Sequence, residues 1–410
     1  GHNDNGPFDR GRARASIKGV SAIDSLEVVI QETGERETVY SFGEYMRRFI
    51  RECREIGAQP ILFSLTPRNA WDEKIPGKIA RVNTTFGMWS KQIAEEMDVP
   101  FIDLNEITAG KFEQFSTWKV NYHFYLDRIH TSDFGARLNA HSAAEGLAKA
   151  THKDLAKLQD CLINTTPPAV DVKREKGKPV VFITGDSTVK NEDKNPDGMW
   201  GWGSQASTIF DTDKITIANE AMAGRSTRTF LEEKRWEKVY NSLQPGDFVL
   251  IQFGHNDIGD IDRGKARGTI ACAHDTSHVY RVRANNKVQN QVIYSFGWYL
   301  KKFIDDGREK GATPILLSLT PRNEWPDGKI ERRTHSYGKW YSEVVAATAV
   351  EFVDVHNITA NALDSIGRKG TKEYYNRDHT HTSLKGAQLN AKSVAKGLRD
   401  IDSPLAKYLK

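Results

Sequence analysis

The sequence predicts an α/β protein, a three-layer sandwich in which helices cover both faces of a flavodoxin-like sheet of five parallel strands. Two observations support this prediction. Short apolar runs alternate with helical patterns through the second half of the 410-residue chain, as in parallel sheets whose strands are joined by crossover helices. The five runs suit an open, doubly wound sheet better than an eight-stranded barrel.

Each predicted strand is a short apolar run. The runs are residues 179–184 (PVVFIT), 214–219 (KITIAN), 247–253 (DFVLIQF), 313–319 (TPILLSL) and 350–355 (VEFVDV). They are rich in β-branched and aromatic residues, which favour strands. Because both faces of a parallel sheet are buried, such strands are apolar throughout instead of alternating with polar residues.

Three segments between and after these runs predict helices. Residues 227–243 have a helical pattern that stops at QPGD. Residues 295–311 form an amphipathic segment that ends on Gly311, a residue suited to helix termination. Residues 383–398 supply a final helix. Predicted helices and strands therefore alternate along this part of the chain, as they do in a layered α/β fold.

A long internal repeat divides the chain. YSFGEYMRRFIRECREIGAQPILFSLTPRNAW at residues 40–71 matches YSFGWYLKKFIDDGREKGATPILLSLTPRNEW at residues 294–325. The opening GHNDNGPFDRGRARA likewise matches GHNDIGDIDRGKARG at residues 254–268. A repeat this long indicates a duplicated domain, because solenoid repeats are much shorter.

The repeat and composition predict three parts. We expect residues 1–162 to be the C-terminal part of one such domain, without its first strands and its nucleophile block. Residues 163–178, with several Thr, Pro and Lys residues, read as a linker. Residues 179–410 are expected to form a complete domain.

The composition excludes several function classes. Hydrophobic residues make up 38% and charged residues 27%, and the net charge is +4. No run approaches the ~20 apolar residues of a membrane helix, and no basic patch favours nucleic acid. We therefore expect neither a nucleic acid nor a membrane as partner. The three cysteines, which are far apart, form neither a CxxC metal motif nor an evident disulfide framework.

Chemically capable residues follow four of the five strands. In open α/β sheets, sites form outside the carboxyl ends of the strands. Ser187 follows the first strand, Gly224 the second and Asn256 the third, whereas Asp378 and His381 come after the fifth. Each has a structural alternative when taken alone, such as a helix cap, a turn or a surface position.

Together these residues supply the parts that acyl transfer requires. Ser187 can attack a carbonyl, His381 can accept its proton, and Asp378 can orient the imidazole. The backbone N–H groups of Ser187 and Gly224 and the side-chain amide of Asn256 can stabilise an oxyanion. No GxSxG surrounds Ser187, which argues against the α/β-hydrolase elbow.

Four sequence blocks, GDST, AGRSTRTF, GHND and DHTHTS, occur in this order. They resemble the blocks of the SGNH or GDSL-like hydrolases, and the residues within them are similar to those of the rhamnogalacturonan acetylesterase branch. The resemblance covers residues 179–401. It implies that Ser187, Asp378 and His381 are catalytic and that Ser187, Gly224 and Asn256 form the oxyanion hole.

The resemblance also implies an activity and a location. The implied enzyme is a metal-independent serine esterase that uses no cofactor. Its partner would be an acetylated polysaccharide or oligosaccharide of the plant cell wall, above all pectic rhamnogalacturonan. The family suggests a secreted or periplasmic protein, although no signal peptide is visible in this chain. A xylan deacetylase, a lipase and a thioesterase remain alternatives, because fold does not fix function.

Two pairs of residues near the site invite a substrate role. Trp200 and Trp202 follow the nucleophile block and could flank a sugar, or they could pack the loop onto the core. Arg225 and Arg228 could meet a galacturonate carboxylate, or they could form ion pairs at a helix start. The sequence leaves both alternatives open, and it does not fix the oligomeric state.

The first copy retains only part of the site. Asn3 matches Asn256, Asp127 matches Asp378 and His130 matches His381, but nothing matches Ser187 or Gly224. Three explanations compete: a fragment of a complete domain, a degenerate module that binds carbohydrate or serves the structure, and completion by exchange between two chains. The sequence favours the fragment, because the copy starts at a block boundary with its asparagine intact.

Overall fold

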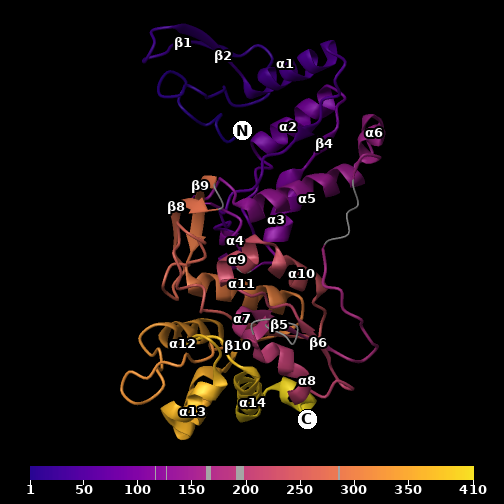
Figure 1. Cartoon of the computed structure of the whole chain (residues 1–410). Coiled ribbons are helices and arrows are strands. Elements are labelled where there is room, and N and C mark those ends of the chain that lie inside the picture. The colour runs from indigo at the N-terminus through magenta and orange to yellow at the C-terminus, as the bar shows by residue number, and fades with distance from the viewer. Residues whose placement is uncertain (116, 126, 163–167, 191–197, 285–286) are drawn as a thin grey trace. The chain divides into compact units, whose positions relative to one another are not determined.

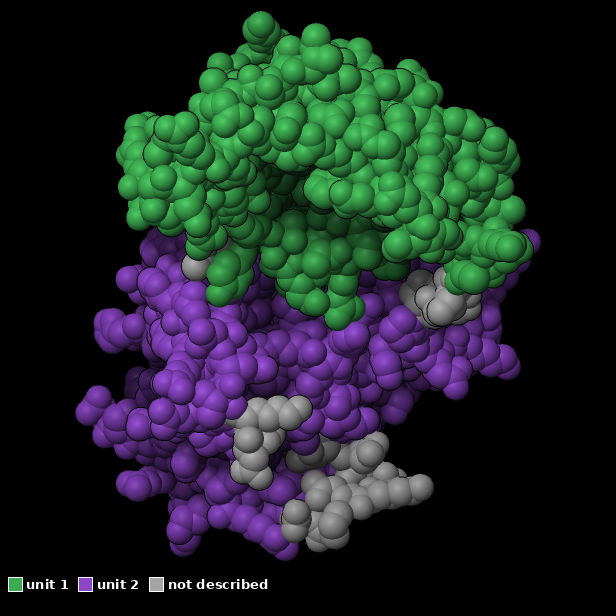
Figure 2. All heavy atoms as spheres, turned by 90° about the horizontal axis from the view of Figure 1, so that it is seen from above, with its two compact units in different colours: residues 1–165 green, residues 166–410 purple. Residues whose placement is uncertain are grey.

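A computed structural model describes residues 1–115, 117–125, 127–162, 168–190, 198–284 and 287–410 (Figure 1). The chain divides into two compact units, Gly1–Thr165 and Thr166–Lys410, here called unit 1 and unit 2 (Figure 2). No helix in the described ranges has both the length and the apolar character needed to cross a membrane.

Unit 2 is built around a parallel sheet of five strands in the order β6, β5, β7, β10, β11. The strands are β5 (Val180–Gly185), β6 (Thr216–Asn219), β7 (Phe248–Gln252), β10 (Thr313–Leu317) and β11 (Glu351–Val353). Each overlaps one of the predicted apolar runs. In chain order the sheet reads 2-1-3-4-5, which is the flavodoxin-like arrangement. The predicted fold class is therefore confirmed.

Helices cover both faces of this sheet (Figure 1). One face packs against α9 (Thr227–Glu232), α10 (Arg235–Ser242), α11 (Phe296–Glu309) and α12 (Tyr337–Thr348). The other packs against α8 (Ala206–Ile209), α13 (Val355–Thr371) and α14 (Leu384–Asp400). Along β5, Val180 and Phe182 face the first layer, whereas Val181 and Ile183 face the second. This burial on both faces explains the uninterrupted apolar runs.

Two details of unit 2 differ from the sequence prediction. The single helix expected over residues 227–243 is two helices, α9 and α10, because Lys234 between them has a left-handed backbone with φ of 59°. An antiparallel hairpin of β8 (Ser277–Ala284) and β9 (Lys287–Tyr294) was not predicted. It forms a separate two-stranded sheet, and much of β8 is exposed, so its sequence lacks the apolar run of a core strand.

Part of the predicted linker packs onto unit 2. Residues 163–167 of that segment lie outside the described residues. The backbone N–H of Val170 donates to the hydroxyl of Ser242 at 2.7 Å, and Arg174 forms an ion pair with the buried Asp247 at 2.7 Å. Val170 also packs against the core. The described part of this segment is therefore fixed to unit 2 by specific contacts.

Unit 1 contains a shorter series of elements. They are β1 (Ser25–Val29), β2 (Arg36–Tyr40), α1 (Phe42–Glu55), β3 (Leu62–Phe63), α2 (Phe86–Glu96), β4 (Phe101–Ile102), α3 (Leu104–Phe112), α4 (Thr117–Asn121), α5 (Asp133–Lys149) and α6 (Ala156–Gln159). A hairpin, a helix and a parallel strand pair, β3 with β4, follow one another as they do from β8 to β11. The described part of unit 1 has no strand that matches β5, β6 or β7.

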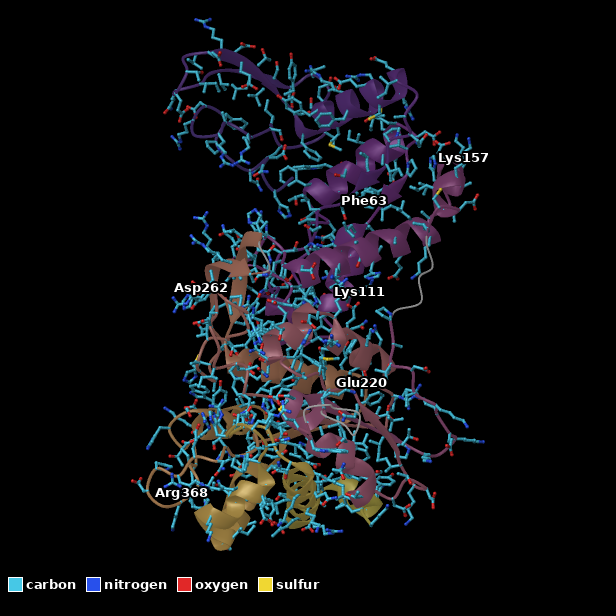
Figure 3. The ribbon with its side chains drawn as sticks, viewed as in Figure 1. Phe63, Lys111, Lys157, Glu220, Asp262 and Arg368 are labelled. Carbon is cyan, nitrogen blue, oxygen red and sulfur yellow. The ribbon has the colours of Figure 1, made fainter. Side chains whose placement is uncertain are left out.

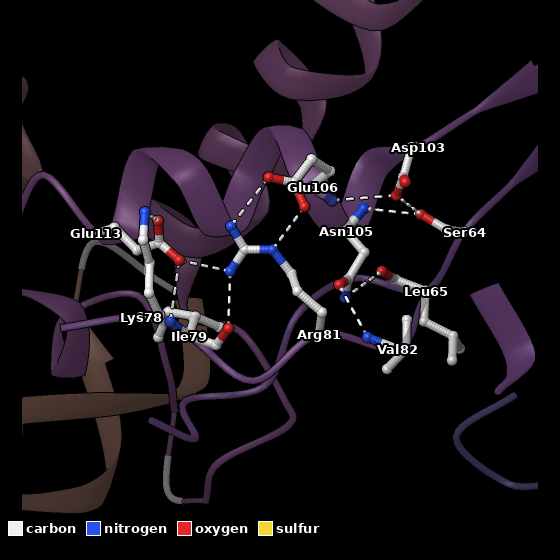
Figure 4. A network of polar contacts seen from close by, with 10 residues as sticks. All are labelled: Ser64, Leu65, Lys78, Ile79, Arg81, Val82, Asp103, Asn105, Glu106 and Glu113. Atoms are coloured by element: carbon white, nitrogen blue, oxygen red, sulfur yellow. Dashed lines mark hydrogen bonds and ion pairs between the residues drawn. The ribbon is translucent and has the colours of Figure 1, made fainter. Parts of the chain in front are cut away.

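Polar contacts repeat between the units as well. In unit 1, Arg81 bridges the carboxylates of Glu106 and Glu113 at 2.7 and 2.5 Å (Figure 4). At the matching place in unit 2, Arg332 pairs with Asp364 at 2.5 Å. The serine–aspartate bond after the strand also recurs: Ser64 donates to Asp103 in unit 1 and Ser318 donates to Asp354 in unit 2, at 2.7 and 2.9 Å. The repeated sequence thus folds into repeated local structure.

Candidate active site

Ser187 lies just after the carboxyl end of β5, with Asp186 between the strand and the serine. It is the first residue of the short helix α7 (Ser187–Lys190) and is 9% exposed. Its Oγ lies 2.9 Å from Nε2 of His381. The preceding Asp186 is buried and accepts hydrogen bonds at its Oδ1 from the backbone N–H and hydroxyl of Thr188, which fixes the turn that presents Ser187.

His381 is held by Asp378 in the loop before α14. The Nδ1 atom of His381 lies 2.7 Å from Oδ2 of Asp378, and the backbone N–H groups of Thr380 and His381 donate to Oδ1 at 2.7 Å each. Burial opposes ionisation of Asp378, but the hydrogen bonds from His381 and Thr380 outweigh it and lower the pKa of that carboxyl. Ser187, His381 and Asp378 therefore form one hydrogen-bonded chain.

Gly224 and Asn256 come from the strands on either side of β5. Since β6, β5 and β7 are neighbours in the sheet, the loops that follow them meet at one edge. Gly224 has a positive φ of 78°, a conformation that glycine adopts without strain. The side-chain amide of Asn256 donates to the carbonyl oxygen of Arg225 at 3.1 Å, which orients it toward the Gly224 loop.

The sequence prediction missed a second set of hydrogen bonds between these two loops. The backbone N–H and hydroxyl of Thr227 donate to Oδ1 of Asp257 at 3.1 and 2.5 Å. Burial raises the pKa of Asp257 to about 7, since the bonds from Thr227 only partly offset the lost hydration, and the nearby Asp186 carboxylate adds to the rise. The signal was present in the sequence, because GHND occurs in both copies with its aspartate.

No group of three or more His, Cys, Asp or Glu side chains in the described ranges could hold a metal ion. The arrangement described above, with a hydroxyl, an imidazole, a carboxylate and loop amides at one sheet edge, suits acyl transfer.

Comparison with known proteins agrees with this chemistry. Residues 183–389 match the GDSL-like Lipase/Acylhydrolase family. The chain belongs to this family. It is accordingly a carboxylic-ester hydrolase, as the sequence predicts.

Two curated relatives are similar to this GDSL-like hydrolase over more than half of its length. A rhamnogalacturonan acetylesterase of Emericella nidulans is 30% identical over 219 residues, which are 53% of this chain and 84% of the relative. The rhamnogalacturonan acetylesterase RhgT of Bacillus subtilis is 30% identical over 248 residues, 57% of this chain and 95% of the relative. A crystal structure of YxiM from Bacillus subtilis aligns with a TM-score of 0.45 and 20% identity, covering 55% of this chain and 58% of that one.

The two tryptophans of the hydrolase that invited a substrate role lie in different surroundings. Trp202 is completely buried, and its indole N–H donates to Oε1 of Gln252 at 2.7 Å. It packs in the core and cannot stack on a sugar. Trp200 is partly exposed; its backbone N–H donates to the carbonyl oxygen of Thr382 at 2.8 Å, and the hydroxyl of Thr382, the neighbour of His381, donates to the carbonyl oxygen of Trp200 at 2.7 Å. Of the two, only Trp200 lies at the site.

The two arginines form the ion pairs that the sequence had offered as the alternative. The side chain of Arg225 pairs with Glu233 at 3.0 Å and donates to the carbonyl oxygen of Ala223 at 2.9 Å. Arg228 is 1% exposed, pairs with Glu232 at 2.9 Å and donates to the carbonyl oxygen of Ile261. Both guanidinium groups are thus engaged by protein acceptors, which weakens the expectation that Arg225 meets the substrate.

In unit 1, Asp127 and His130 reproduce the local geometry of Asp378 and His381. The Nδ1 atom of His130 lies 2.6 Å from Oδ2 of Asp127. The side chain of His130 is 78% exposed, however, whereas that of His381 is 26% exposed. Asn3 is also exposed, and its Oδ1 accepts a hydrogen bond from Arg14 at 3.1 Å. No serine hydroxyl is recorded next to His130 in the described part of unit 1.

Proposed function

We propose that this hydrolase removes O-acetyl groups from a plant cell-wall polysaccharide, pectic rhamnogalacturonan being the preferred substrate. One observation carries the proposal: the hydrogen-bonded chain from Ser187 Oγ to His381 Nε2 at 2.9 Å and from His381 Nδ1 to Asp378 Oδ2 at 2.7 Å. The two relatives that are 30% identical are both rhamnogalacturonan acetylesterases, which supports the choice of substrate.

The first half-reaction acylates the serine. Oγ of Ser187 attacks the acetyl carbonyl carbon while its proton passes to Nε2 of His381. The tetrahedral intermediate then collapses: the ester C–O bond breaks, and His381 returns the proton to the departing sugar oxygen. Asp378 keeps the proton of Nδ1 in place, so that Nε2 is free to act as the base.

The second half-reaction repeats these steps with water as the nucleophile. Water attacks the acetyl-Ser187 carbonyl and gives a proton to Nε2 of His381; the bond between the acyl carbon and Oγ of Ser187 then breaks, His381 returns the proton to Oγ, and acetate is released. In both halves, negative charge develops on the former carbonyl oxygen. The backbone N–H groups of Ser187 and Gly224 and the side-chain amide of Asn256 are proposed to stabilise that charge.

The test is acetate release by the whole chain. We expect faster release from acetylated rhamnogalacturonan than from acetylated xylan, with slower hydrolysis of 4-nitrophenyl acetate. Ser187→Ala should abolish release on all three, because the nucleophile is lost. Undiminished release by Ser187→Ala would overturn the assignment.

The comparison of substrates separates the rival specificities. Faster release from acetylated xylan would identify a xylan deacetylase, and a preference for long-chain or thiol esters would identify a lipase or a thioesterase.

Because the polymer lies outside the cells that degrade it, we also propose that the enzyme is exported.

We further propose that unit 1 is a non-catalytic copy of the later part of the fold. The matched contacts of Asp127 with His130, and the network around Arg81, support this reading. A carbohydrate-binding role for unit 1 predicts that the whole chain retains affinity for polysaccharide when Ser187 is replaced.

A further inference from the structure

Arg267 lies beside the candidate oxyanion hole without having entered the mechanism above. Its Nη1 atom donates to the carbonyl oxygen of Gly224 at 2.8 Å. A Cβ atom placed on Gly224 would lie 3.0 Å from the same nitrogen. The guanidinium group therefore stands directly against the residue whose backbone N–H is proposed to bind the oxyanion.

The backbone on both sides of Arg267 is fixed. Ala266 is buried against Val282 and Ile293 of the β8–β9 hairpin, and it has a positive φ of 43°. On the other side, a Cβ atom on Gly268 would lie 2.0 Å from the carbonyl oxygen of Gly259, so only glycine fits there. A left-handed alanine costs on the order of 1 kcal/mol and is maintained only where the surroundings impose it.

The loop that carries Arg267 is also attached to the hairpin. The backbone N–H of Arg283 in β8 donates to the carbonyl oxygen of Asp262 at 2.7 Å, and Asp262 is labelled beside the hairpin in Figure 3. The hairpin thus contacts the loop through this hydrogen bond and through the packing of Ala266.

Unit 1 repeats this arrangement. Arg14 matches Arg267, and the preceding Ala13 is left-handed too, with φ of 42°. The serine hydroxyl of Ser16 donates to Asp4, just as Thr269 donates to Asp257 in unit 2. Without a Gly224 counterpart, Arg14 turns to the side chain of Asn3. Both copies therefore carry an arginine directly after a left-handed alanine, although Arg267 contacts Gly224 and Arg14 contacts Asn3.

The guanidinium group of Arg267 has more N–H donors than the described residues engage in hydrogen bonds. A guanidinium group has five N–H donors, and one hydrogen bond, to Gly224, is recorded for Arg267 among the described residues. No carboxylate of the described residues forms an ion pair with it, whereas neighbouring Arg225 and Arg228 are paired with Glu233 and Glu232. Arg267 is only half-buried, so an external anion can reach it.

We propose that Arg267 binds the carboxylate of a uronic acid residue adjacent to the acetylated sugar. The proposal rests on the function proposed above and adds the group that selects an acidic polymer. A planar guanidinium beside the oxyanion hole can hold a carboxylate through two parallel hydrogen bonds. It would thereby fix the position of the neighbouring ester relative to Ser187.

The test compares two substrates that differ only in charge. Acetylated rhamnogalacturonan oligosaccharides are assayed with the whole chain, alongside the same oligosaccharides with their uronic carboxyls reduced to primary alcohols. For Arg267→Ala we expect kcat/KM on the acidic substrate to fall about 10- to 100-fold, mainly through KM. On the reduced substrate and on 4-nitrophenyl acetate, we expect changes of less than about 3-fold. Arg267→Lys should recover part of the loss, because it keeps the charge without the fork.

Arg263→Ala is the matched control. Arg263 lies in the same loop, carries the same charge and is 77% exposed in an ion pair with Asp260. We expect this variant to keep the wild-type preference for the acidic substrate. An equal loss on acidic, reduced and small substrates in Arg267→Ala would mean that Arg267 only anchors the Gly224 loop, and it would overturn the proposal. No loss on the acidic substrate would overturn it too.

A binding measurement keeps this inference separate from the proposed function. In the Ser187→Ala background, deacetylated acidic oligosaccharides are titrated against proteins with and without Arg267→Ala. We expect affinity to fall about 10-fold or more when Arg267 is removed. Weaker binding in a protein whose wild-type form releases no acetate would refute the esterase proposal and support the carboxylate site, whereas unchanged binding would refute the site itself.

Discussion

The Oγ atom of Ser187 and the Nε2 atom of His381 lie 2.9 Å apart, although the two residues are separated by 194 positions in the chain. Ser187 is presented by the turn after β5, and His381 by the loop before α14. By contrast, the partner of His381 on its other side, Asp378, is only three positions away. The contact of Asp378 with His381 therefore depends on their local spacing in the chain. The contact of Ser187 with His381 depends on the tertiary fold, which brings two distant loops together.

Replacing the histidine in each unit should separate the two sites. His381→Ala should lower kcat on 4-nitrophenyl acetate by about 10³-fold or more, because Ser187 loses its base. His130→Ala should leave kcat within about 2-fold, because His130 has the same aspartate contact but no neighbouring serine hydroxyl is recorded in the described part of unit 1. A comparable loss in both variants would contradict our view that unit 1 is non-catalytic.

Asp378→Asn tests the orienting carboxylate. The lowered pKa of Asp378 keeps it ionised above its ordinary value of 3.8, where it can hold the proton of Nδ1. An amide in its place can donate to Nδ1 and favour the wrong tautomer, so kcat should fall about 10³–10⁴-fold with little change in KM. Steady-state kinetics at neutral pH will check this. Asp127→Asn, the matched change in unit 1, should leave both constants unaltered.

Gly224→Ala tests the oxyanion loop. Gly224 has φ of 78°, and a Cβ atom there would crowd Nη1 of Arg267 at 3.0 Å. We expect a loss of roughly 1 kcal/mol in the free energy of unfolding from the backbone and a fall of about 10²-fold in kcat from the displaced N–H. Denaturant unfolding measures the change in the free energy of unfolding, and acetate release measures the change in kcat.

Gly246→Ala provides the control for that experiment. Gly246 has φ of 90°, and no heavy atom lies within 4 Å of the position of an added Cβ. It should show a similar loss of stability with kcat near the wild-type value. If Gly246→Ala lowered kcat as much as Gly224→Ala, general destabilisation would explain both results.

The raised pKa of Asp257 leads us to expect an unusual dependence of stability on pH. Its pKa is raised to about 7 in the folded protein from an ordinary value of 3.8. Between these values the folded state holds a proton that the unfolded state has released, so stability falls as pH rises through this window and the loss is complete above about pH 7. Asp257→Asn removes this contribution.

The two proteins should therefore diverge with pH. We expect wild type to lose on the order of a few kcal/mol more than Asp257→Asn between pH 4.5 and pH 8. Urea unfolding at both pH values measures the difference. Asp262→Asn, an exposed change in the same loop, should track wild type. Parallel pH profiles for wild type and Asp257→Asn would contradict the raised pKa.

Side-chain direction limited what the sequence could predict about the site. Trp200 and Trp202 stand two positions apart in one glycine-rich loop, yet Trp202 enters the core to bond with Gln252. Arg225 and Arg267 are both basic residues near the site, yet Arg225 is neutralised by Glu233 and Arg267 is not paired with any described carboxylate. Spacing along the chain does not distinguish the members of either pair, because their neighbours come from distant segments.

By itself the sequence determined the five strands of unit 2, the strand ends that carry Ser187, Gly224 and Asn256, and the contact of Asp378 with His381. Each depends on apolar periodicity or on a spacing of a few residues, which local chemistry controls. The tertiary structure alone decided the break at Lys234, the burial of Trp202 and the approach of Arg267 to Gly224. Those features depend on packing between segments far apart in the chain, and only the folded sheet brings such segments into contact.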